Sequence, residues 1–568
     1  MRTKHWLANL KKDNTMKKPI LIAILAFITF TSCENSDLEL LDDPNNITLE
    51  KADLNRYTNR IQLDFASFMR QMGRNAAQAT RVEYMFGRSY NNVFQPASLD
   101  GEWTLAYQNM FSDIAAAESI ALEAEENKHL GVMKILKAYA LITLVDHFGD
   151  VPFSQITNIV QHTSPVADPG GVVYGGAILL LDEAKEHLRA EGNSLENDFY
   201  YNNDFDKWIK LANTIKMQTY LARRLLDESI IIKFNAIANN PSSYISTEAD
   251  DFAFQYGVNE SNPDTRHPGY SADYTGNGVS RYRSNWLMHT MLENDDPRRR
   301  FYFYRQVDCT PGAGCPPDQG RLPCSVTQVP PHFTAGMVFC SVSEGYWGRD
   351  HGNAEGLPQD GLQKTAGGIY PFGGRFDGDE FESVSLGIGG GGAGIMPIML
   401  SSYVDLMRAE ASLSQNNAGA AGNALRSALQ KSTQKVVGFA SLDPDANTEL
   451  IPDAATINNF IANVVGEFSS VDTNGKWEIL GNQTMITNYG NGHLGYNFYR
   501  RTGFPYRGVN PTHALQFNVE ANPGTFIRSF LYPAIEANVN SNITQKPNVS
   551  LQVFWDNNPP SPSFPPAN

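Results

Sequence analysis

The stretch 134–153, KILKAYALITLVDHFGDVPF, is apolar on nearly every side when it is drawn as a helix. A helix without a polar face has to be buried inside the fold. It is too short to span a bilayer, and lysines and an aspartate interrupt it. Gly149 can take the left-handed conformation that closes a helix, and Pro152 cannot continue one. The sequence therefore predicts a buried central helix that stops abruptly at 147–152.

Several other stretches have the apolar spacing of amphipathic helices. They are 49–79, 103–126, 173–190 and 204–225 in the first half, and 397–415, 418–432, 456–468 and 475–489 in the second. They come roughly in pairs without strand-like alternation between them, as tetratricopeptide-type repeats do, but no clean repeat of about 34 residues is present. The pattern also fits a general helix bundle. The predicted fold class is mostly α, with tetratricopeptide-like helix pairs forming a scaffold.

A long irregular region separates the two helical parts. Between residues 246 and 396 the helical periodicity fades, and Gly, Pro, Asn and aromatic residues dominate, with one short helix expected at 285–292. Long irregular regions inside a compact domain are uncommon and tend to carry function. We expect 49–568 to form a single domain with a helical scaffold over 49–245 and 397–490, a loop-rich binding region over 246–396, and an extended tail over 510–568.

The first 32 residues have the order of an export signal. A positive segment begins at Met16, an apolar stretch follows at 20–30 that is too short to span a bilayer, and small residues lead to Cys33. This order resembles a bacterial lipoprotein signal, in which Cys33 becomes the acylated first residue. An ordinary secretory signal with a chance cysteine is the alternative. Residues 33–48 are polar and acidic, which suits a flexible tether to a lipid anchor.

The other four cysteines fall within 32 residues of the loop-rich region, at Cys309, Cys315, Cys324 and Cys340. In an exported chain this clustering predicts two local disulfides, for which three connectivities are possible. A zinc site is the alternative, but no C-x-x-C pair is present and an oxidising compartment disfavours one. Two disulfides would hold a Pro/Gly-rich loop that has little apolar content of its own.

Charge and motifs argue against several functional classes. The formal net charge of -16 disfavours nucleic-acid binding, because phosphates need cationic partners. HExxH, the Walker phosphate loop and GxSxG are absent, and the histidines show no ligand spacing, so no catalytic residue, metal or cofactor is predicted. Four acids could act as glycosidase carboxylates, although such a run in a Gly-rich loop is more often a solvated surface: Asp377, Asp379, Glu380 and Glu382.

Aromatic side chains stand beside polar residues at several places in the loop-rich region. Exposed rings stack on the apolar faces of sugars, while Asn, Asp and Arg bind the hydroxyl groups. The alternative is that these rings pack the loops together. We expect a glycan site that includes Tyr282, Trp286, Tyr346, Trp347, Arg349, Asp350 and Tyr370.

Several motifs, in order along the chain, resemble those of the SusD/RagB family of Bacteroidetes outer-membrane lipoproteins. The helix 136–139 that ends in DHFGDVP at 146–152 is close to the most recognisable pattern of the family, although Lys137 stands where the family usually has arginine. The remaining similar stretches are Trp103 with Tyr107, Trp208 to Arg224, Asp296-Pro297-Arg298, Tyr370-Pro371, Tyr403 to Ala411 and Tyr532 to Asn538.

This resemblance implies a protein that binds and performs no chemistry. It would be a lid, built on tetratricopeptide-like helix pairs, over a SusC-like TonB-dependent transporter in the outer membrane. Its loops would capture an oligosaccharide at the cell surface, or a peptide as in some members. The acidic tether resembles the signal that directs such lipoproteins to the outer face of the outer membrane. A secreted hydrolase on a helical scaffold and a structural lipoprotein are the alternatives.

Overall fold

The computed structural model describes residues 53–156, 162–310, 324, 327–354, 362–505 and 517–558. Leu54–Asn568 forms one compact unit. Its regular structure is mainly helical and its strands are few and short, so the predicted mostly α fold class is confirmed. No helix in these ranges is both long and apolar enough to cross a membrane. The predicted export signal, Cys33 and the tether lie outside the described residues.

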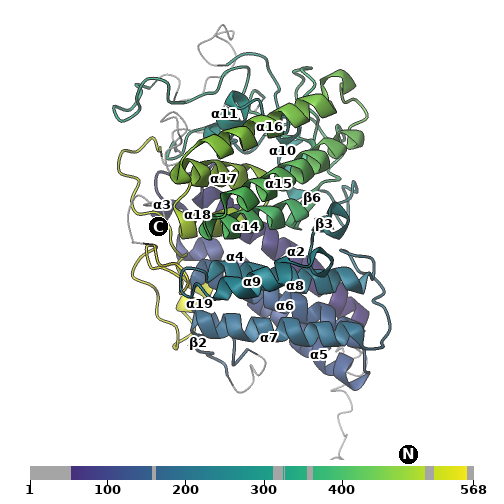
Figure 1. The fold of residues 1–568 in the computed structure, drawn as a ribbon. Coiled ribbons are helices and arrows are strands. Elements are labelled where there is room, and N and C mark those ends of the chain that lie inside the picture. The colour runs from purple at the N-terminus through teal and green to yellow at the C-terminus, as the bar shows by residue number, and fades with distance from the viewer. Residues whose placement is uncertain are drawn as a thin grey trace, which may run out of the picture. The chain divides into compact units, whose positions relative to one another are not determined.

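The first half of the unit is a set of packed helices, drawn from purple to teal in Figure 1. They are α2 (Leu54–Ala79), α3 (Tyr90–Val93), η3 (Pro96–Leu99), α4 (Asp100–Trp103), the π-helical η4 (Thr104–Phe111), α5 (Ser112–Glu123), α6 (Asn127–Phe148), α7 (Gly170–Arg189), α8 (Phe205–Ala222) and α9 (Ile230–Ala238). Helix α6 packs against α7, α7 against α8, and α8 against α9. Neighbours in sequence are therefore neighbours in space, as helix pairs require.

The second half contains five longer helices, drawn in green in Figure 1. They are α14 (Ser401–Ser414), α15 (Ala418–Gly438), α16 (Ala454–Ser470), α17 (Thr473–Thr487) and α18 (His493–Thr502), with the short 3-10 helices η8 (Phe439–Leu442) and η9 (Thr448–Leu450). The predicted helix start at residue 397 is wrong. Residues 395–399 form a buried strand, because the apolar run IMPIM finds a partner strand near residue 252.

The loop-rich region holds short elements only. Its helices are η5 (Pro241–Ser243), η6 (Glu248–Asp250), α10 (Pro268–Asp273), α11 (Asn285–Glu293), α12 (Arg299–Tyr302) and α13 (Ile369–Phe372). Its antiparallel strand pairs are β3 (Phe252–Gln255) with β6 (Ile395–Met399), and β4 (Phe303–Tyr304) with β5 (Ala366–Gly367). A third pair, β1 (Val151–Pro152) with β2 (Ala167–Asp168), follows α6. The sheets are too small to form a core, so the helices carry it.

Helix α6 is the buried element that the sequence predicts. From His129 to Phe148 every residue except Lys134 is buried. Each large apolar side chain (Val, Leu, Ile, Phe or Met) taken from water in this way stabilises the fold by about 1.5–3 kcal/mol. The helix ends where Gly149 takes a φ of 81°, a conformation that a side chain disfavours.

The end of α6 is closed by the C-terminal tail, drawn in yellow in Figure 1, which carries the short helix α19 (Ala534–Ala537). The backbone N–H of Phe530 donates to the carbonyl of His147 at 2.7 Å. The indole Nε1 of Trp555 donates to a carboxylate oxygen of Asp146 at 2.8 Å. Asp146 also accepts from Asn497 Nδ2 at 2.7 Å and from the Tyr174 hydroxyl. One buried carboxylate thus joins α6, α7, α18 and the tail.

Candidate ligand-binding site

A surface pocket of about 160 Å³ lies where the end of α2 meets the loop-rich region. Two segments far apart in the sequence form most of its wall, the turn after α2 and the segment 280–284 that leads into α11. Its lining residues are Arg74, Gln78, Val82, Glu83, Tyr84, Phe86, Ser280, Arg281, Tyr282, Arg283, Ser284, Phe303 and Tyr489. The pocket therefore combines aromatic side chains with charged ones, the mixture that sugar recognition uses.

Three aromatic rings form one wall of this pocket. Tyr84 meets Tyr282 edge-on with ring centroids 5.7 Å apart, and it meets Phe86 in the same way at 6.4 Å. The two tyrosines are buried, whereas Phe86 is 60% exposed. Burial raises the pKa of Tyr84 to about 12, so its phenol stays neutral and donates to the carbonyl of Asn353. Phe86 packs against Tyr84, and much of its ring surface is exposed to solvent.

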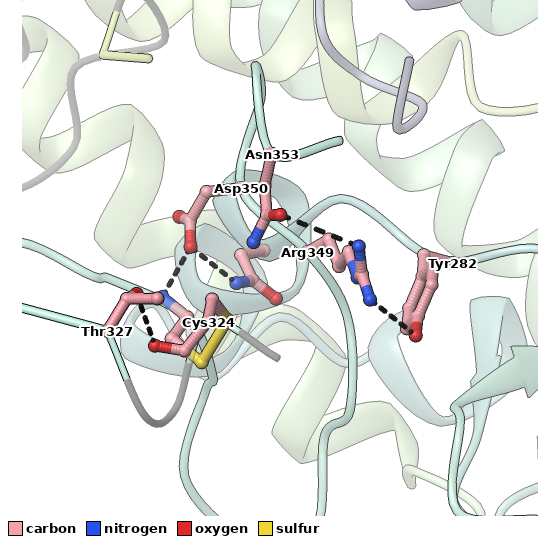
Figure 2. The surroundings of a disulfide bond; sticks show 8 residues. Tyr282, Cys324, Thr327, Arg349, Asp350 and Asn353 are labelled. Atoms are coloured by element: carbon pink, nitrogen blue, oxygen red, sulfur yellow. Dashed lines mark hydrogen bonds between the residues drawn. A yellow bond between two sulfur atoms is a disulfide. The ribbon is translucent and has the colours of Figure 1, made fainter. Parts of the chain in front are cut away.

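Tyr282 is held by cations from the segment beyond the disulfide loop. Arg349 Nη2 donates to its hydroxyl at 3.0 Å, and the guanidinium carbon lies 4.2 Å from the ring centroid (Figure 2). Lys364 Nζ lies 4.3 Å from the same centroid. Contacts of this kind fix an aromatic side chain in one orientation. Arg349 therefore positions Tyr282 at the pocket and is itself fully buried.

A disulfide bond lies next to the residues that hold Tyr282 in place. Cys324 and Cys340 are bonded with their Cα atoms 5.5 Å apart, which confirms that these two cysteines pair. The Asp350 carboxylate accepts from the backbone N–H of Cys340 and from Asn285 Nδ2 at 3.1 Å (Figure 2). Cys309 is also disulfide-bonded, and Cys315 lies outside the described residues. The disulfide loop is thereby tied to the start of α11.

Replacing Asp350 by asparagine is expected to stabilise the protein more at pH 7 than at pH 4. Burial raises the pKa of Asp350 from 3.8 to about 6, so the folded carboxyl keeps a proton that the unfolded chain loses. Its contribution to stability is full below pH 3.8 and is lost as the pH rises through 6. Asparagine does not titrate. Urea unfolding should show a gain that is larger at pH 7 by about 2 kcal/mol.

The control for this pH comparison is Asp445→Asn, which changes an exposed carboxylate. Its effect on the free energy of unfolding should be small and similar at both pH values. If Asp350→Asn and Asp445→Asn show the same pH dependence, burial does not raise the pKa of Asp350.

The sequence-predicted ligand residues separate into two groups. Tyr282 lies in the pocket, with Arg349 on its ring, and Trp347 joins its cluster together with the disulfide. Trp286, Tyr346 and Tyr370 belong instead to the main hydrophobic core. The premise that these rings are exposed is wrong, because none is more than 9% accessible. A loop-rich region has few helices to cover its aromatic rings, so the rings become buried by packing against one another. Direct ligand contact by this set stays a prediction.

Comparisons with known proteins identify the fold. A family described as "Starch-binding associating with outer membrane" matches residues 44–313. The structure of a SusD/RagB family protein from Bacteroides thetaiotaomicron is similar, with a TM-score of 0.64 and 16% identity, over 89% of this chain and 99% of that one. Residues 44–313 are therefore SusD-like, and the chain has the fold of SusD/RagB family proteins. The resemblance in its motifs is confirmed, and the family is one that associates with the outer membrane.

Two other similar structures are described as binding chitin. A chitin-binding protein has a TM-score of 0.62 and 18% identity, over 89% of this chain and 100% of that one. A chitin-binding SusD homolog from Flavobacterium johnsoniae has a TM-score of 0.58 and 16% identity, over 89% and 98%. Identities this low establish the shared fold. No curated protein matches the sequence.

In this SusD-like chain the acids of the loop-rich region serve a structural role. Arg305 Nε donates to Asp377 at 2.7 Å, Arg300 Nη1 to Asp379 at 2.8 Å, and Arg375 Nη1 to Glu382 at 2.8 Å. Glu380 accepts from the backbone N–H of Gly378 at 3.1 Å. A glycosidase needs two carboxyl groups that face the scissile bond of the substrate, whereas three of these carboxylates face arginines of the protein. These pairings argue against the hydrolase alternative.

Sequence reasoning missed several pocket residues, notably Arg74, Phe86 and Arg281. The segment after α2 does carry aromatic residues, namely Tyr84, Phe86, Tyr90 and Phe94, but it lies in the helical part of the sequence and not in the loop-rich region where the site is predicted. A second local signal lies at 281–283, where arginine, tyrosine and arginine alternate so that both cations share one side of an extended segment. What makes the site is the meeting of two segments about two hundred positions apart.

Proposed function

We propose that this SusD-like protein captures an oligosaccharide at the cell surface and acts as the non-catalytic lid of a SusC-like TonB-dependent transporter. The observation that carries the proposal is Phe86, an exposed ring that lines a pocket together with other aromatic side chains and with charged ones. Aromatic faces of this kind stack on sugar rings. The chitin-binding descriptions of two similar structures support a saccharide as the ligand class.

The size of the pocket sets how much of the ligand it holds. Its volume of about 160 Å³ lies below the roughly 300–1,000 Å³ typical of sites that enclose a drug-sized ligand. A site this small accommodates one or two units of a longer chain and leaves the rest outside. Such partial enclosure suits a protein that must hand its ligand on to a transporter.

The proposed location follows from the N-terminal sequence. An export signal that ends at Cys33 would place a lipid on this residue, and the acidic segment 33–48 would act as the tether between the lipid and α2. The lipid would hold the binding unit at the outer face of the outer membrane, next to a barrel partner. Co-purification of a barrel transporter from native outer membranes tests this partner.

Replacing Phe86 by alanine is expected to weaken saccharide binding about 5- to 30-fold, which corresponds to about 1–2 kcal/mol of stacking and buried area. The change removes an exposed ring, so the thermal unfolding temperature should stay close to that of the unchanged protein. Isothermal titration calorimetry against a panel of oligosaccharides and peptides measures the affinity and identifies the ligand class.

The matched control is Ile232→Ala on α9. Ile232 is 68% exposed and does not line the pocket, so its removal should leave the affinity unchanged. Equal affinity in Phe86→Ala and in the unchanged protein would place the binding site elsewhere. Binding of peptides and of no saccharide would make the protein a peptide-capturing lid instead.

A further inference from the structure

Four arginines gather at the pocket and at a smaller hollow beside it. Arg70 and Arg74 lie one turn apart on α2, and Arg281 and Arg283 lie two residues apart on the segment before α11. Arg74, Arg281 and Arg283 line both hollows, and Arg70 joins them in the smaller one, whose volume is about 30 Å³. Like charges this close destabilise a fold unless an anion compensates them.

The acids of the two hollows do not compensate these arginines. Asp273 is engaged in an ion pair with Arg283. Within the described ranges, Arg70, Arg74 and Arg281 have no carboxylate in ion-pair contact. Glu83 is the other acid that lines the hollows, and it is a single charge. The lining residues therefore carry an excess of two positive charges, four arginines against two acids.

Arg74 shows that the excess has an energetic cost. Its Nε is buried and has no hydrogen-bond partner among the described residues. Burial, together with the charges of Arg281 and Arg70, lowers the pKa of the Arg74 guanidinium, and the charges of Glu83 and Glu102 oppose this shift without cancelling it. A buried N–H without an acceptor destabilises the protein. The guanidinium group of Arg74 therefore has donor capacity beside the pocket that no described residue uses.

His267, which lines the smaller hollow, lies in the same positive field. Burial and the charges of Arg70, Arg281 and Arg283 lower the pKa of His267 well below its usual value. Its Nδ1 accepts from the backbone N–H of Gly269 at 2.9 Å, as a neutral imidazole does. The chain as a whole has a net charge of -16, so this cationic hollow stands out against an acidic protein. A local positive potential in a cleft concentrates anions there.

We propose that the pocket selects anionic saccharides, whose uronate carboxylate or sulfate ester oxygens are bound by Arg70, Arg74 and Arg281. This inference rests on the proposed saccharide-binding function. Guanidinium groups match such oxyanions with paired N–H donors, which gives both strength and orientation. The exposed ring of Phe86 would stack on the sugar that carries the charge or on its neighbour. Neutral chains would lack the partner that the arginines require.

The test compares charged with neutral saccharide probes, among which an oligogalacturonate and its methyl ester share one backbone and differ in charge. Calorimetry measures the affinity for an oligogalacturonate, for its methyl ester, for a sulfated galacto-oligosaccharide and for a neutral chito-oligosaccharide. At least one charged probe should bind about tenfold or more tightly than the neutral ones, and added salt should weaken its binding. The uronate and sulfate arms show which oxyanion is preferred, and tight binding of either supports the proposal.

Two variants assign the effect to the arginines. Arg74→Gln and Arg281→Gln should each weaken the charged probe about tenfold and leave the neutral probes unchanged. Because each removes an uncompensated cation, neither should lower the unfolding temperature, whereas a structural arginine would. The matched control is Arg88→Gln, an exposed arginine after the same turn that does not line either hollow and pairs with Glu520 at 3.6 Å. Its affinities should equal those of the unchanged protein.

The outcomes separate this inference from the function on which it rests. If neutral saccharides bind as tightly as charged ones, the anionic selectivity is wrong and the saccharide-binding function stands. If no saccharide binds, the proposed function is wrong and the inference falls with it. If a poly-glutamate peptide binds as tightly as the charged saccharides, the hollow recognises anions in general and the saccharide class is wrong.

Discussion

Asp146→Ala is expected to lower the free energy of unfolding by about 3–5 kcal/mol, because it breaks a buried charged network. The carboxylate is fully buried at the end of α6. It accepts from Trp555 Nε1 at 2.8 Å and from Asn497 Nδ2 at 2.7 Å, and it pairs with His493 Nε2 at 3.2 Å. Alanine leaves these buried donors without an acceptor. Urea unfolding monitored by circular dichroism measures the loss.

The same variant has a defined pH dependence. Burial alone would raise the pKa of Asp146, but hydrogen bonds with His493 and Tyr174 outweigh it and bring the pKa to about 2. The carboxylate therefore contributes stability above pH 3.8, its value in the unfolded chain, and loses it as the pH falls toward 2. The difference between Asp146→Ala and the unchanged protein should shrink over that interval.

The control for this prediction is Asp182→Ala on α7. Asp182 accepts from Lys216 Nζ at 2.7 Å, but its side chain is 46% exposed, so its removal should cost less than about 1 kcal/mol. Similar losses in the two variants would contradict a central role for Asp146. A large loss only in Asp146→Ala would show that one residue holds α6, α18 and the C-terminal tail together.

The sequence predicted α6 well and its main contact poorly. A helix that is apolar all round has only one stable place, and Gly149 marks its end, so burial and boundary both follow from local information. The role of Asp146 does not, because its partners lie at Tyr174, His493, Asn497 and Trp555, brought together only by tertiary packing. An aspartate in an apolar helix indicates a buried partner without naming it.

The candidate site shows the same division. Aromatic composition predicts a binding site in the loop-rich region, and Tyr282 from that region does line the pocket. Composition cannot tell a ring that packs from a ring that is exposed, since both are apolar residues in an irregular segment. Trp347, almost fully buried with its Nε1 donating to the carbonyl of Cys309 at 2.6 Å, is of the first kind. Phe86, which the sequence did not mark, is of the second.

The family motifs predict the overall fold better than hydrophobic periodicity does, because motifs from several segments together carry information that no single segment contains. Periodicity predicts a helix start at residue 397, but a short apolar run fits a strand equally well. In the structure this run pairs with β3 and is a strand. The family motifs, by contrast, agreed with the whole architecture. Neither kind of signal marks Arg74, since the role of a cation depends on which acids lie near it in space.

Glu410→Ala is the second change expected to cost about 3–5 kcal/mol of unfolding free energy. Glu410 on α14 accepts from Arg501 Nε at 2.8 Å and from Arg224 Nε at 3.2 Å, and all three side chains are buried. Burial would raise the pKa of Glu410, but the charge of Arg501 outweighs it and lowers the pKa, so the acid is ionised. Alanine leaves two buried guanidinium groups without their anion. Urea unfolding measures the loss.

A triple replacement separates the cost of unpaired charge from the value of the ion triad. In Glu410→Met/Arg224→Met/Arg501→Met no charge is left behind, and apolar replacements of buried ion networks are often neutral or stabilising. The triple variant should therefore be more stable than Glu410→Ala alone, although it changes more residues. If it is less stable, the triad itself holds α14 to α18 and to the end of α8. If Glu410→Ala costs under about 1 kcal/mol, water must reach these arginines and the triad behaves as an exposed pair would.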